Sequence, residues 1–160
     1  MFDNILALAL HYATQTQPSA IWIEDESQRI GHINIPTPFW GNMRKCPVYF
    51  LDVPFEERLQ YIVKEYGVIP KDKLVNAIIR IQKKLGGLDT KNAINYLLEN
   101  NIKECFSILL KYYDKHYTKA LNNRANLQSL LHKITCIKAS DTNAAQQLIE
   151  AQTKSQSIIQ

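Results

Sequence analysis

The sequence predicts a mostly helical α/β fold, and three observations support this interpretation. Apolar residues recur at helical spacing through most of the chain, whereas short apolar runs predict about three buried strands of a parallel sheet. One of these runs is followed by a proline and then by a helical pattern, which is the order of elements typical of α/β proteins. The 160 residues are 46% hydrophobic, so a single packed domain is expected over residues 1–160.

The first third of the chain predicts a helix, a strand and an extended segment. Phe2–Thr14 has the helical pattern, and Ala20–Ile23 is a short apolar run that predicts a buried strand with acidic residues at its end. Residues 29–36 alternate isoleucines with small or polar residues, which favours an extended segment. A short helical turn is expected at Phe39–Met43.

The middle of the chain predicts a second strand followed by helices. Val48–Leu51 is the strand, and Pro54 stands at the start of the next helix, where its missing N–H is tolerated. Further helical patterns cover Lys71–Lys84, Thr90–Asn100 and Ile102–Leu121, and the paired glycines 86–87 should end the first of them. Residues 71–121 are therefore expected to form a large helical insertion.

The end of the chain predicts one more strand and a last helix. Ile134–Ile137 is the third strand, Asp141 can cap a helix from Thr142 to about Ala151, and the tail 154–160 should fray. Three short strands are fewer than the five or so of a typical sheet. The domain is therefore expected to be incomplete, with apolar strands left exposed at the place of a missing neighbour.

Composition limits the partners and the location of the chain. No run of about 18 apolar residues is present and the first ten residues have no basic flank, so neither a membrane partner nor a signal peptide is expected, and the location is predicted to be cytoplasmic. The three cysteines lack Cys-x-x-Cys spacing, which favours reduced structural thiols over a disulfide or zinc site. Residues 81–160 carry 11 basic and 6 acidic groups, a net charge of +5 that would suit nucleic acid or a lysine-coated surface equally.

Several motifs occur together in a fixed order. They are the acidic loop 24–31 (EDESQRIG), Ile35-Pro36, the strand and turn 47–54 (PVYFLDVP) with Glu57-Arg58, the stretch from Ala77-Ile78 to Leu85-Gly86-Gly87, and 112–117 (YYDKHY). In this order they resemble the C-terminal region of tRNA 2-selenouridine synthases. The resemblance runs from Phe2 to about Leu121, with a weaker similarity to the end of the chain.

This resemblance implies a transferase that replaces the sulfur of wobble 2-thiouridine in tRNA by selenium. The family reaction passes through a geranylated intermediate, with selenophosphate and geranyl diphosphate as substrates, on a rhodanese-like domain with a catalytic cysteine followed by a P-loop domain. The 160 residues contain no G-x-x-x-x-G-K-[ST] phosphate loop, and none of their cysteines lies in a rhodanese-like loop. The resemblance thus implies a fragment with a partial P-loop-like sheet, inactive by itself, without a cofactor of its own or an assigned catalytic residue, and with tRNA and the missing upstream half as partners.

The acidic loop and the second strand supply candidates for a phosphate or nucleotide site. In a P-loop fold, carboxylates at a strand end can hold a metal ion or polarise water near phosphates, and an arginine can bind phosphate through two hydrogen bonds. The structural alternatives are a solvated loop and ordinary ion pairs, of Arg29 with the acids or of Arg58 with Asp52 or the neighbours of Glu57. The candidates are Glu24, Asp25, Ser27, Arg29 and Arg58.

Basic clusters and one aromatic patch supply candidates for tRNA binding. Lysines and arginines can contact phosphates, and exposed aromatic rings can stack on unpaired bases, although solvated helix faces carry the same residues. Tyr113 and Tyr117 continue an apolar stripe and are expected in the core, which leaves Tyr112 and His116 exposed. The candidates are Arg44, Lys45, Arg80, Lys83, Lys84, Tyr112 and His116, and no metal site is expected.

One other class of function fits the same residues. A non-catalytic helical module that binds RNA or a protein would need the basic clusters and the helices but no phosphate loop. A nucleotide kinase fits poorly, since the phosphate loop is absent from the 160 residues.

Overall fold

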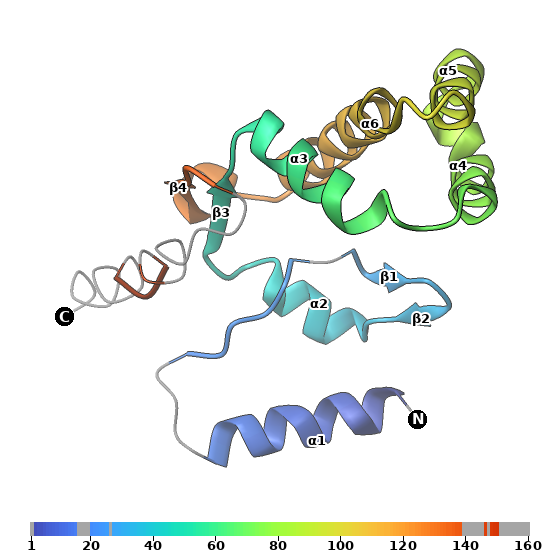
Figure 1. Ribbon diagram of the computed structural model, residues 1–160. Helices are drawn as coiled ribbons and strands as arrows, with labels where there is room; N and C mark the ends of the chain where they lie inside the picture. Colours follow the sequence, from blue (N-terminus) through green and yellow to red (C-terminus); the bar gives the residue numbers. More distant parts are fainter. Residues whose placement is uncertain (1, 16–19, 26, 139–145, 147, 151–160) are drawn as a thin grey trace. The chain divides into compact units, whose positions relative to one another are not determined.

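The computed structural model describes residues 2–15, 20–25, 27–138, 146 and 148–150, and these form a mostly helical α/β structure (Figure 1). The chain divides into two compact units, which are described separately below. The first unit comprises Met1–Val48 and Arg124–Leu131, and the second comprises Tyr49–Asn123 and His132–Gln160, each as far as it is described. The predicted fold class, mostly helical with a small parallel sheet, is confirmed; its P-loop-like character stays a prediction.

The first unit contains helices and a short hairpin, and its elements are α1 (Phe2–Gln15), β1 (Arg29–Ile30), β2 (Ile33–Asn34), α2 (Thr37–Met43) and α7 (Leu127–Leu130). The hairpin is antiparallel, with Ile30 opposite Ile33. Gly31 begins its two-residue turn at φ +61°, a conformation that glycine adopts without a steric penalty. The segment predicted to be extended over residues 29–36 is thus a short hairpin with a turn at residues 31–32, whereas the short helix after it is confirmed and begins two residues earlier than predicted.

The second unit holds the larger helices and all but the first residue of each strand of one sheet. Its elements are β3 (Val48–Asp52), α3 (Phe55–Tyr66), α4 (Lys71–Leu85), α5 (Gly87–Leu98), α6 (Ile102–Asn122) and β4 (Leu131–Thr135). Pro54 and Pro70 precede α3 and α4, and Gly86, at φ +96°, separates α4 from α5. Helix α6 packs against α3 and α5, and α5 also packs against α4. The helices predicted over 71–121 match α4 to α6; that they form an insertion stays a prediction.

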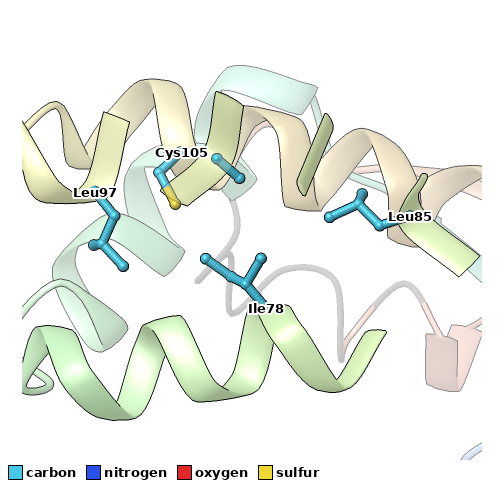
Figure 2. Close-up of a cluster of buried hydrophobic side chains, with 5 residues drawn as sticks. Ile78, Leu85, Leu97 and Cys105 are labelled. Carbon is cyan, nitrogen blue, oxygen red and sulfur yellow. The ribbon is translucent and has the colours of Figure 1, made fainter. Parts of the chain in front are cut away.

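Two groups of buried side chains hold these helices together. Ile78, Leu85, Ala93, Leu97 and Cys105 form the first, and Figure 2 shows Ile78 pointing from α4 toward Leu97 and Cys105. Leu59 of α3 packs with two residues of α6 in the second. Each fully buried leucine or isoleucine contributes about 1.5–3 kcal/mol relative to exposure, so α3 to α6 are held by burial of their apolar stripes.

Two strand predictions differ from the structure. Ala20–Ile23 has no regular secondary structure and belongs to neither sheet, and Ile21, Trp22 and Ile23 are 40–48% exposed. A parallel strand of this kind forms only where neighbouring strands pair with it and other elements cover its faces. The apolar sequence of Ala20–Ile23 was therefore not sufficient to predict a strand. The third strand begins earlier than predicted, at Leu131 instead of Ile134. The helix from Thr142 to Ala151 with its Asp141 cap lies largely outside the described residues, and the tail 154–160 lies entirely outside them.

Candidate functional site

In the first unit, Asp25 lies against two arginine side chains. Nη2 of Arg124 donates to Oδ1 of Asp25 across 2.5 Å, and Nη1 of Arg44 lies 3.8 Å from the same oxygen. Nη1 of Arg124 also donates to the backbone carbonyl oxygens of Met43, Arg44 and Cys46 at 3.3–3.5 Å. The Arg124 side chain is 2% exposed. This arginine therefore ties the acidic loop to the end of α2 from inside the unit.

The charge on Asp25 is largely balanced by these guanidinium groups. A buried arginine without a counter-charge would cost several kcal/mol, and Asp25 supplies that counter-charge. A carboxylate shared by two cations has little charge left for a metal ion, so the geometry favours a structural or anion-binding role for this cluster. In the part of the chain that the structure describes, no group of three or more His, Cys, Asp or Glu side chains is placed to hold a metal ion.

Arg124 is a residue that the sequence reasoning missed. It lies in a polar stretch at the end of α6, outside every motif discussed above. One signal was available, since Arg124 is the single arginine among 11 basic residues in 81–160. Arginine has a planar fork of donors that lysine lacks, so a lone arginine among lysines indicates directed hydrogen bonding.

Two of the remaining phosphate-site candidates, Ser27 and Arg29, stabilise the hairpin. The Ser27 hydroxyl donates to the carbonyl of Arg29 across 2.7 Å, and Nε of Arg29 donates to the carbonyl of Gly31 across 3.2 Å. Glu24 is exposed. The structure thus brings Asp25 together with Arg44, gives Ser27 and Arg29 local backbone partners, and places the fifth candidate, Arg58, in the second unit.

Arg44 and Lys45 line a small pocket of about 310 Å³ in the first unit, together with residues around α7 that include Asn126 and Ser129. The Arg44 guanidinium lies over the ring of Trp40, 5.4 Å from its centroid, which fixes the direction of the side chain. Lys45 is exposed. Two cations at the wall of one pocket form a surface that suits an anionic group such as a phosphate.

In the second unit, Arg58 forms a two-pronged ion pair with Asp114. Nη1 and Nη2 donate to the two carboxylate oxygens across 2.5 and 3.0 Å, and Nε donates to the carbonyl of Val53 across 3.0 Å. Hydrogen bonding to Asp114 raises the pKa of the Arg58 guanidinium, against the opposing effect of burial. The pair joins the start of α3 to α6, and Asp114, not Asp52, is the partner. To bind a phosphate, Arg58 would have to exchange Asp114 for it.

A large apolar pocket of about 1040 Å³ lies beside this ion pair, with walls from β3, α3, α4 and α6. Its lining is mostly aliphatic and aromatic, with Arg58, Asp114, Asp52 and Lys73 as the charged members. Clefts for small molecules typically measure about 300–1,000 Å³. This pocket is therefore at the upper limit for a small ligand and wide enough for a polypeptide segment.

The tyrosines of α6 are arranged in the reverse of the predicted order. Tyr113 and Tyr117, expected in the core, are 49% and 57% exposed and line the pocket, whereas Tyr112 is half-buried against the first core group. Tyr112 also packs edge to face against His116, which is exposed as predicted. The helical phase of Tyr113 and Tyr117 was correct, but the face they continue is the wall of an open pocket.

The cations of α4 are exposed as the sequence predicted. Arg80, Lys83 and Lys84 all lie on the solvent side of this helix. Whether they contact tRNA stays a prediction, as it does for the other candidates.

These observations define a mostly helical α/β protein whose candidate sites combine arginine–carboxylate pairs with exposed cations. Residues 1–152 match the family model described as the tRNA 2-selenouridine synthase AAA domain, so the chain belongs to that family. Among the described residues, no helix has the length and apolar character needed to cross a membrane.

Curated proteins named tRNA 2-selenouridine synthase are similar to most of the chain. Those of Alcanivorax borkumensis, Marinobacter nauticus and Psychromonas ingrahamii are 26%, 29% and 27% identical to it, over 78%, 77% and 78% of its length. The matched regions make up 42%, 41% and 42% of these relatives, so the chain spans about two fifths of their length. No solved structure matches the chain significantly.

Proposed function

We propose that this chain is the C-terminal part of the AAA domain of a cytoplasmic enzyme that modifies tRNA. The observation that carries the proposal is the match of residues 1–152 to the domain family of tRNA 2-selenouridine synthases. The basic surface of Arg44 and Lys45, and the cations of α4, support a polyanionic substrate.

The reaction proposed for the complete enzyme has two stages. Geranyl diphosphate alkylates the sulfur of wobble 2-thiouridine with loss of diphosphate. The selenium of selenophosphate then attacks C2 and displaces the sulfur as geranylthiol, and water cleaves the Se–P bond to release phosphate and leave 2-selenouridine. The 160 residues contain neither a phosphate loop nor a cysteine in a rhodanese-like loop. We therefore assign to this chain the binding and positioning of tRNA, and to the rest of the family polypeptide the phosphate loop and the reactive cysteine.

The test compares the chain alone with the chain supplemented by the remainder of the Alcanivorax borkumensis relative, meaning the part outside the matched region. Each sample receives 2-thiouridine tRNA, geranyl diphosphate and selenophosphate, and the nucleosides are measured by mass spectrometry. We expect no 2-selenouridine and no appreciable ATP or GTP binding from the chain alone, and conversion from the mixture.

The matched region of the relative, mixed with its own remainder, is the positive control. Selenium incorporation by the 160 residues alone would contradict the assignment of roles. If the control pair converts tRNA and the mixture with this chain does not, the proposed function is wrong.

A further inference from the structure

Strand β3 pairs with β4 in a parallel sheet that has both faces partly open. The Tyr49 ring stacks on His132 near the start of the strands, with centroids 4.8 Å apart, and the Cys136 amide donates to the Asp52 carbonyl across 3.1 Å near their end. Since both contacts advance in the same direction, the strands are parallel. Among the described residues, β4 is the single strand neighbour of β3. Parallel sheets normally have more strands and are covered on both faces.

The side chains of β3 are those of a central strand. Phe50 and Leu51 are consecutive and so point to opposite faces, yet they are 39% and 41% exposed. A strand that natural proteins leave at an edge usually carries a charge, a proline or a bulge, which discourages pairing with other chains. The run Val48–Leu51 has none of these, and Asp52 comes only at its end.

The apolar pocket continues this open surface. Phe50 and Leu51 line the pocket together with Tyr113 and other side chains of α4 and α6. Tyr113 is 49% exposed, although it continues the apolar stripe of α6 and is next to Asp114, which pairs with Arg58 of α3. The exposed edge of β3 and the neighbouring pocket of about 1040 Å³ together form a larger surface than a small ligand would cover.

We propose that the edge of β3 opposite β4 pairs with an apolar β-strand from the part of the family polypeptide that these 160 residues do not contain, and that the segment joined to that strand covers Tyr113. The proposal rests on the proposed function, because the relatives that identify the family are more than twice as long as the region matched here. Backbone pairing along β3 supplies the alignment of the added strand, and burial of the apolar pocket supplies most of the affinity.

The first test measures association. The full 160-residue chain is mixed with the remainder of the Alcanivorax borkumensis relative, and sedimentation velocity gives the dissociation constant; the relative's own matched region with the same remainder is the control. We expect a one-to-one complex, weakened about tenfold or more by Tyr113→Glu, since a charge would enter the buried interface. Tyr61→Glu is the matched variant: Tyr61 is 47% exposed on α3 and lies outside the pocket.

The second test does not depend on a variant that might unfold. Hydrogen exchange of the unaltered chain is followed at the amides of residues 49–53, with and without the remainder. Because Asp52 faces β4, the amide of Leu51 faces the opposite edge, and we expect its exchange to slow by about tenfold on binding. The Val53 amide already donates to the Leu51 carbonyl, so it should change less. Exchange on the exposed side of α4, at Arg80 and Lys83, should stay unchanged as an internal reference.

The outcomes separate this inference from the proposed function. If β3 is protected from hydrogen exchange but tRNA is not converted, the inference is supported and the proposed function is rejected. If tRNA is converted without protection of β3, the inference alone is overturned. The inference is also overturned if Tyr113→Glu and Tyr61→Glu weaken the complex equally. The inference is also overturned if the remainder associates neither with this chain nor with the relative's own matched region. A homodimer of the 160-residue chain that already protects β3 would show that a second copy is the occupant, and would equally overturn the proposal.

Discussion

The ion pair with Asp114 occupies the side chain of Arg58 in the second unit and thereby limits what else this arginine can bind. Nη1 and Nη2 of Arg58 donate to the carboxylate of Asp114, and Nε donates to the backbone carbonyl of Val53. The side chains are 33% and 37% exposed, so water partly screens the pair. Its two-pronged geometry nevertheless gives it more coupling than a solvated pair, since both hydrogen bonds are fixed by the fork of the arginine.

We expect a double-mutant cycle of Arg58→Met and Asp114→Asn to give a coupling free energy of about 1 kcal/mol, after allowance for this exposure. The measurement is the free energy of unfolding in urea for the four proteins. The control cycle uses Lys103 and Glu56, which lie 3.0 Å apart but are 56% and 61% exposed, and should give about 0–0.5 kcal/mol. Equal coupling in the two cycles would show that Arg58 is not held by Asp114 in solution.

The same scale shows what sequence reasoning can and cannot find about a site. Arg58 was identifiable because it follows a strand, a proline and a helix start in sequence. Its partner Asp114 lies 56 residues away and Arg124 lies 99 residues from Asp25. No local pattern encodes such pairs, so the partners of the candidate residues had to come from the fold, and the roles of these candidates stay predictions.

At the scale of elements, helix α6 carries a thiol in the centre of the helical core. Cys105 is 1% exposed and packs among the residues of α4 and α5, and burial raises the pKa of its thiol from 9.0 to about 11. Between these two values the unfolded chain has lost the thiol proton while the folded chain keeps it. Deprotonation therefore favours unfolding in this range.

We expect the stability contributed by the neutral thiol to be complete below pH 9 and to be lost as the pH rises through about 11, a loss of at most about 2–3 kcal/mol. The measurement is the pH dependence of the free energy of unfolding for the unaltered chain and for Cys105→Ala. Because tyrosines and lysines titrate in the same range, the difference between the two slopes is the relevant quantity. Cys46→Ser, at an exposed thiol, should leave the slope unchanged, and parallel profiles for Cys105→Ala would contradict the burial of this thiol.

Elements also show why helices were easier to predict than strands. The helical patterns placed α4 and α6 within one residue of their observed bounds, because an amphipathic stripe records in one segment which face is buried. The strand predicted at Ala20–Ile23 did not form, since a strand depends on neighbours that a single segment cannot record. Tyr113 and Tyr117 show what a helical pattern does and does not record. It placed both tyrosines on the correct face of α6, but it does not record whether another segment covers that face, and both are exposed.

At the scale of the whole molecule, charge is distributed unevenly along the chain. Residues 1–80 carry 8 basic and 9 acidic groups, whereas 81–160 carry 11 and 6. The net charge of the second half is therefore +5, and several of its lysines are exposed on helices. A polyanion such as tRNA releases condensed counterions from its phosphates when lysines bind them, which makes such binding depend steeply on salt.

We expect any affinity of the chain for tRNA to fall as salt rises, and the double variant Lys83→Ala with Lys84→Ala to weaken it by reducing the slope of log K against log salt by about 1–2. Both lysines are exposed near the end of α4, so their removal should leave the melting temperature within a few degrees of the original. The measurement is fluorescence anisotropy of labelled tRNA at several salt concentrations. The control variant, Lys64→Ala with Lys103→Ala, removes the same charge from α3 and from the exposed ion pair with Glu56. If both double variants lower the slope equally, net charge alone governs binding and α4 is not a specific contact. If neither changes the slope, Lys83 and Lys84 do not contact tRNA phosphates.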